Sequence, residues 1–153
     1  MKKFIFIFLT IFIKNFVAEA DIKKPNNLIK PYEVVKIQLQ SLKKNDKPYK
    51  DYGILQTWTF AHPKNQRVTG PINKFKNMIK SDSYFMLLNH ISHEVKEVYI
   101  SDTVATFQVT ILDKEKKYYR FKWQVEKYNI EGDLKDCWLT TAVSQPNNLG
   151  SSI

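Results

Sequence analysis

The polar stretch of residues 62–69 carries the side chains best suited to recognise a ligand. His62, Asn65, Arg67 and Thr69 lie within it, and Gly70-Pro71 follows. As a loop, it could hold a carboxylate or phosphate between the guanidinium of Arg67 and the free amides at the start of the next helix. The alternative is that Asn65 and Thr69 satisfy backbone groups in a tight turn, while Arg67 is solvated. The segment is therefore a candidate anion-binding loop with a structural alternative.

Acid-base or metal chemistry has fewer candidates. An enzyme built on this chain would use His62, Tyr84 or His90 as its acid or base. His90 and His93 also have the His-x-x-His spacing that can supply two imidazoles to a metal. On a strand, however, residues three apart face opposite sides, and no third ligand is near beyond Glu94. We therefore expect no metal site and interpret both histidines as hydrogen bonding the loop before the first strand.

Cofactor-binding motifs are missing from the sequence. It has no glycine-rich phosphate loop, nucleophile elbow or dinucleotide fingerprint, and only four glycines from which to build such loops. Cys137 is the only cysteine, so no intramolecular disulfide can form, and its neighbours Trp138 and Leu139 indicate a buried thiol. We expect no cofactor.

Aromatic residues are abundant, and most of them belong to the predicted core. Rings that project inward from a curved sheet can also line an apolar pocket with a few polar tips, which suits a small ligand. Trp58, Tyr119 and Trp123 are the ring-bearing candidates for such contacts.

These side chains must be positioned by helices in the first half of the chain. Val35, Leu39 and Leu42 share one face of a helix that begins at Pro31 and ends at Asn45-Asp46. The predicted helices span residues 31–44, 51–61 and 71–79, with a helical turn at 84–88 and the polar loop 62–68 between the second and third.

From His93 onward the apolar period changes from 3.6 to 2, which predicts strands. Phe107, Val109 and Ile111 alternate with polar residues, as do Phe121 and Trp123 in the next segment. The predicted strands span residues 93–100, 103–112, 117–128 and 134–143, with a bulge in the first because Val95 and Val98 do not share a face. Helices followed by an antiparallel meander predict an α+β domain, with the helices packed on a curved sheet.

The N-terminus has the features of a secretory signal peptide. Lys2 and Lys3 precede an apolar run, Phe4–Ile13, that is too short to span a membrane, and Ala18-Glu19-Ala20 fits a cleavage site. We expect residues 1–20 to be a signal peptide cleaved after Ala20, 21–30 a flexible leader, 31–145 one domain, and 146–153 a disordered tail.

The mature chain is basic, with 21 Lys and Arg against 14 Asp and Glu, a formal net charge of +7. Its lysines are dispersed rather than gathered in a block, so the simplest interpretation is a solvated surface. An exported protein meets little nucleic acid, so no nucleic-acid partner is expected. An anionic membrane surface or an acidic protein fits the charge better.

The chain resembles the nuclear transport factor 2-like superfamily, and within it the group called domain of unknown function 4864. The resemblance covers residues 31–145. It rests on Pro31-Tyr32-Glu33-Val34-Val35, Gln38-Leu39, Asn45-Asp46, Phe60-Ala61-His62-Pro63, Asn65, Thr69-Gly70-Pro71, Phe75, Met78-Ile79 and Cys137-Trp138. It implies an α+β cone in which the first helix closes a bent sheet over a pocket. It implies no activity, since the superfamily hosts enzymes, transport factors and binding modules.

The sequence therefore predicts a small exported binding or accessory module without catalysis, whose ligand is small and apolar or anionic. The periplasm, the thylakoid lumen and the outside of the cell all fit the export signal. One alternative is an isomerase, dehydratase or hydrolase-like enzyme that uses the same cavity. Another is a homodimeric assembly factor that uses the open sheet face carrying Arg120, Lys122, Gln124 and Glu126.

Overall fold

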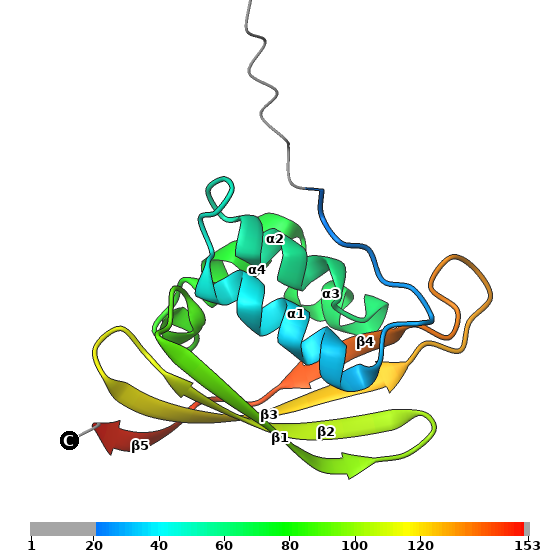
Figure 1. Cartoon of the computed structure of the whole chain (residues 1–153). Helices are drawn as coiled ribbons and strands as arrows, with labels where there is room; N and C mark the ends of the chain where they lie inside the picture. The colour runs from blue at the N-terminus through cyan, green and yellow to red at the C-terminus, as the bar shows by residue number, and fades with distance from the viewer. Residues whose placement is uncertain (1–20, 152–153) are drawn as a thin grey trace, which may run out of the picture.

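Helices cover one face of a curved antiparallel sheet in the computed structural model, which describes residues 21–151 (Figure 1). This confirms the predicted α+β class. The signal peptide predicted at residues 1–20 lies outside the described residues. The helices are α1 (Pro31–Lys43), α2 (Tyr52–Thr59), α3 (Pro63–Thr69), α4 (Ile72–Ile79) and the 3-10 turn η1 (Phe85–Leu87). The strands are β1 (Ser92–Ile100), β2 (Val104–Leu112), β3 (Lys117–Lys127), β4 (Trp138–Val143) and β5 (Asn147–Ser151).

Helix α1 lies across the sheet and closes the core. Pro31 occupies the first turn of α1, where a backbone N–H has no acceptor within the helix, so its missing N–H costs no hydrogen bond. Glu33 Oε2 accepts from the Lys30 amide at 2.9 Å. The predicted apolar face is buried, with Val34, Val35, Leu39 and Leu42 fully enclosed. Gln38 shares that face, 1% exposed, and is its one polar member among the described residues.

The sheet is a meander in the order β1-β2-β3-β4. Phe107 lies opposite Trp123 and Val109 opposite Phe121, so the predicted apolar faces of β2 and β3 meet in one core. In β1 the register shifts between Glu97 and Tyr99, which confirms the predicted bulge around Val98. Strand β4 begins at Trp138 rather than residue 134, because residues 134–137 form a turn.

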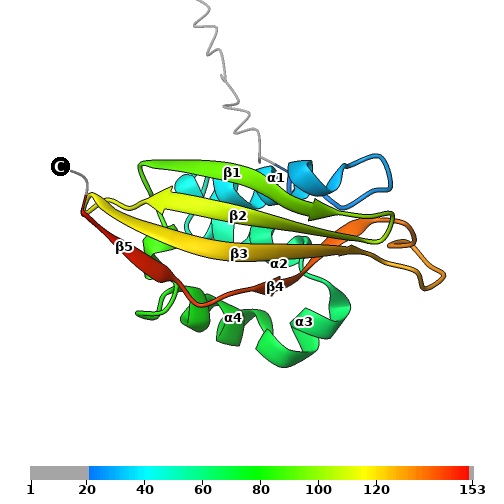
Figure 2. The ribbon, with the colours of Figure 1, turned by 90° about the horizontal axis from the view of Figure 1, so that it is seen from below.

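The C-terminal residues expected to be disordered include a strand. β4 pairs with the second half of β3, and β5 pairs with its first half, so the two follow one another along the same edge (Figure 2). Between them, the Ser144 amide donates to the Lys122 carbonyl at 2.9 Å. The free edge of β3 supplies the hydrogen bonds that a polar segment, Asn147–Ser151, could not provide for itself.

Two other segments differ from the prediction. The expected loop 62–68 is mostly helix α3, because Pro63 favours a first turn and the His62 ring caps it by accepting from the Lys64 amide at 3.0 Å. The leader 21–30 follows the helices rather than standing free. Gln56 accepts from the Lys23 amide at 2.8 Å and donates to its carbonyl at 2.7 Å, and Ile29 is buried.

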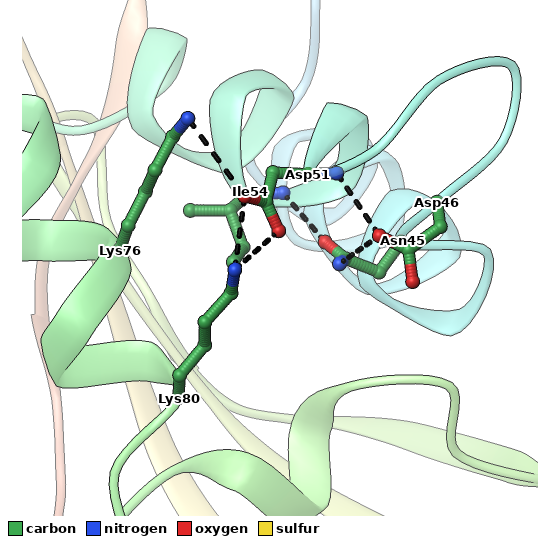
Figure 3. A network of polar contacts seen from close by, with 6 residues as sticks. All are labelled: Asn45, Asp46, Asp51, Ile54, Lys76 and Lys80. Atoms are coloured by element: carbon green, nitrogen blue, oxygen red, sulfur yellow. Dashed lines mark hydrogen bonds and ion pairs between the residues drawn. The ribbon is translucent and has the colours of Figure 1, made fainter.

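A polar network fastens the α1–α2 connection to α4 (Figure 3). The buried Asn45 accepts from the Ile54 amide at 3.1 Å and donates to Asp46 at 2.9 Å. Asp51 pairs with Lys80 at 2.7 Å, and this contact is the main reason that the pKa of Asp51 lies below its usual value.

Gly53 permits the close approach of α2 to the end of α1. A Cβ at this position would collide with the carbonyl of Ser41 and lie 2.9 Å from Cα of Asn45. The Gly53 amide donates to the Asn45 carbonyl at 2.9 Å. Only glycine leaves room for this arrangement, which in turn sets the position of α2 beside the core.

Candidate functional site: a pocket between the helices and the sheet

A pocket of about 80 Å³ lies between the helical layer and the sheet, and we call it the central pocket. A cavity of about 150 Å³ can hold benzene, so this one suits a ligand of a few non-hydrogen atoms. Apolar side chains form most of its wall. The lining residues are Gln38, Leu42, Thr57, Ala61, Asn65, Thr69, Phe75, Met78, Ile79, Tyr84, Leu87, Trp123, Thr140 and Val143.

Gln38 organises one wall of the central pocket. Its Oε1 accepts from Thr140 Oγ1 at 2.7 Å and from Trp123 Nε1 at 3.1 Å, while its Nε2 donates to the Thr57 carbonyl at 3.0 Å. These side chains are all buried. The wall therefore offers hydrogen-bonding groups whose positions are fixed by α1, α2, β3 and β4 together.

The remaining polar lining comes from α3 and from Tyr84, just ahead of η1. Asn65 Nδ2 donates to the Thr140 carbonyl at 3.4 Å, and Thr69 Oγ1 donates to the Asn65 carbonyl at 2.9 Å. The Tyr84 hydroxyl donates to the Val143 carbonyl at 3.3 Å. Burial raises the pKa of Tyr84, so its phenol keeps its proton at neutral pH. No other lining residue of the pocket is ionisable.

Three of the seven predicted ligand-contact residues, Asn65, Thr69 and Trp123, line the central pocket. Trp58 instead packs on Phe75, with ring centroids 5.0 Å apart, and Tyr119 is buried elsewhere in the core.

Arg67 is exposed in the last turn of α3. The structure therefore does not form the expected loop, in which a guanidinium and free amides converge on an anion. Because residues 63–69 form a helix, their backbone hydrogen bonds run along the helix axis and do not converge on a common point as in the expected loop.

His62 contributes to a different cavity, beside the C-terminal end of β3. The residue is 7% exposed, and its ring packs edge-on against that of Tyr128 with the ring centroids 5.3 Å apart. Burial is the largest cause of its lowered pKa, and the charge of Glu126 opposes the shift. Because its Nδ1 accepts from the Lys64 amide, the neutral ring carries its proton on Nε2. Lys64, Glu126 and Tyr128 also line this cavity.

His90 and His93 lie side by side, contrary to the expectation that they face apart. His90 precedes β1, so the strand alternation that would separate the two rings does not apply. Nδ1 of His90 donates to the Leu87 carbonyl at 2.8 Å, and its Nε2 lies 2.7 Å from Nδ1 of His93. Burial lowers the pKa of His90 to about 4. With His90 neutral, Nδ1 of His93 is the donor between the rings.

Gln38, Thr57 and Thr140 are the polar pocket residues that sequence reasoning missed. The only sequence signal of this polar wall was a glutamine on the otherwise apolar face of α1.

In residues 21–151, no group of three or more His, Cys, Asp or Glu side chains could hold a metal ion. No helix in this part of the chain is long and apolar enough to cross a membrane. No known protein family, curated protein or solved structure matches the chain.

Proposed function

We propose that this protein binds a small, largely apolar molecule in the central pocket and acts as a non-catalytic binding or accessory module. The supporting observation is the pocket wall itself: an apolar cavity with fixed hydrogen-bonding groups at Gln38, Trp123 and Thr140. Apolar walls with few, well-placed polar groups are typical of small-molecule sites.

The fold proposal is a nuclear transport factor 2-like cone of the domain of unknown function 4864 group. It is supported by the position of α1 across a curved antiparallel sheet, with a pocket between them (Figure 1). Fold alone assigns no activity, so the functional proposal rests on the pocket.

Binding is favoured over catalysis by the character of the lining. Tyr84 is its ionisable member, and burial raises the pKa of this phenol, which makes it a weak acid or base near neutral pH. His62 and His90, the other acid-base candidates, are not among the lining residues.

Thermal denaturation with xenon, acetamide and propan-2-ol, small probes that match the size of the pocket, tests the binding proposal. A ligand that binds only the folded state raises the melting temperature with concentration. Val143→Phe should fill the pocket and abolish that rise. The matched control is Val95→Phe, at a half-buried strand valine outside the pocket lining, which should retain it. A wild-type protein that none of the three probes stabilises, or equal loss in both variants, would contradict the proposal.

We also propose that the mature protein acts after export, with residues 1–20 removed. The support is the charged start, short apolar run and Ala18-Glu19-Ala20 of the sequence. N-terminal sequencing of protein from an exporting host should give Asp21 as the first residue. Recovery of Met1 would refute cleavage.

A further inference from the structure

The net positive charge of residues 21–153 comes from the first part of this segment. Residues 21–90, which form the leader and helices, contain 13 Lys and Arg against 5 Asp and Glu, a formal net charge of +8. Residues 91–153, which include the sheet, contain 8 against 9, a net charge of −1. Residues 21–90 form the helical layer on one side of the sheet, so this side of the molecule carries the excess of positive charge (Figure 1).

We call this surface the helical face, defined by the exposed and half-exposed Lys and Arg side chains of residues 21–90. A groove of about 310 Å³ crosses it, and Lys23, Lys44 and Lys47 lie along its walls. Tyr52 and Gln56 also line the groove, and no carboxylate does. Three ammonium groups around one depression form a site that would attract a phosphate group.

We propose that the helical face docks on an anionic lipid bilayer, with the Lys23–Lys44–Lys47 groove taking a lipid phosphate. Twelve of its 13 basic residues are lysines, which act as point charges toward a diffuse negative surface, whereas arginine dominates where a carboxylate is held in a bidentate pair. This favours a bilayer over an acidic protein.

Exposed apolar side chains accompany the lysines. Leu28 and Val68 are 83% and 73% exposed, and Tyr49 is 40% exposed between Lys47 and Lys50. Tyrosine and aliphatic side chains next to lysines suit the boundary between headgroups and acyl chains.

Tyr52, which lines the groove, also contacts the first described residue: its hydroxyl donates to the Asp21 carbonyl at 3.5 Å. The leader therefore lies beside the groove. The inference is independent of the central pocket, whose lining includes none of the groove lysines.

Co-sedimentation of the full chain with two kinds of vesicle tests the proposal. One kind is pure phosphatidylcholine, and the other contains about one third phosphatidylglycerol. The segment of residues 1–20, with its apolar run and with Lys2, Lys3 and Lys14, is the same in every variant, so differences between variants report on residues 21–153. Binding to the anionic vesicles should exceed binding to the neutral ones and fall when salt rises from about 0.1 M to about 0.5 M.

The decisive comparison uses two triple variants that remove the same charge. The helical variant combines Lys23→Gln, Lys44→Gln and Lys47→Gln, and the sheet variant combines Lys96→Gln, Lys114→Gln and Lys122→Gln. Each lysine near an anionic surface strengthens partitioning about fivefold, so the helical variant should lose on the order of a hundredfold. The sheet variant should lose less than about tenfold, through the long-range effect of net charge alone. Equal melting temperatures would show that both variants are folded.

Equal losses in the two variants would overturn the proposal, because net charge rather than the helical face would then drive binding. A wild-type protein that does not distinguish the two vesicles would also overturn it. Retention on immobilised polyglutamate without binding to anionic vesicles would assign the helical face to an acidic protein instead.

Discussion

Gln38→Leu should destabilise the fold, although the substitution replaces a buried polar side chain by an apolar one of similar size. Gln38 makes three hydrogen bonds, to Thr140, Trp123 and Thr57. Two of these partners keep another bond: Trp123 Nε1 lies 3.3 Å from Thr140 Oγ1, and the Thr57 carbonyl also accepts from the Phe60 amide at 3.2 Å. The Thr140 hydroxyl loses its acceptor in a site that is 3% exposed.

An unsatisfied buried polar group costs about 1–3 kcal/mol, and each of the two weakened bonds adds about 0.5–1 kcal/mol, so we expect a loss of about 2–5 kcal/mol. Urea unfolding followed by far-UV circular dichroism measures it. The matched control is Gln40→Leu, at an exposed position of the same helix, which should stay within about 0.5 kcal/mol. A loss below about 1 kcal/mol for Gln38→Leu, or equal losses at both positions, would refute the reasoning.

Three further outcomes are expected. The pKa of His90 is about 4 in the folded protein against the ordinary value of 6.5, so the unfolded state binds the proton first as pH falls. Stability should therefore decline by up to about 3 kcal/mol between pH 6.5 and 4, and urea titrations of His90→Gln should show a flatter decline. Gly53→Ala should lower stability by about 1–3 kcal/mol in thermal denaturation, because its Cβ meets the Ser41 carbonyl, and an unchanged melting temperature would count against that contact. Trp123→Ala should cost about 3–5 kcal/mol and Lys122→Ala less than about 0.5 kcal/mol in urea, whereas equal small losses would argue against the strand register.

The elements with strong apolar periodicity were predictable from the sequence. Phe107, Val109 and Ile111 alternate over a strand length, and Val35, Leu39 and Leu42 repeat at helical spacing, so burial alone determines their structure. Residues 147–151 and 63–69 lack such a pattern. Their structure depends on what lies beside them, the free edge of β3 in one case and a proline with a capping histidine in the other.

The candidate site was less predictable than the fold. Trp123, Asn65 and Thr69 were identified by residue type, but the bonds of Gln38 to Thr140 and Trp123 join segments that are far apart in sequence. His90 lies outside β1 both in the prediction and in the structure, so the expectation that the two rings face apart was wrong because it applied strand alternation to a residue ahead of the strand.

The separation of Gln38 from Thr140 by 102 residues constrains how the chain can fold as it is made. Synthesis delivers the N-terminus first, so α1 emerges before β3 and β4 exist to cover its apolar face. Its valines and leucines have no native partner on the sheet until the last strands follow. The core therefore cannot close before nearly the whole chain has been made, and the apolar face of α1 stays exposed until then.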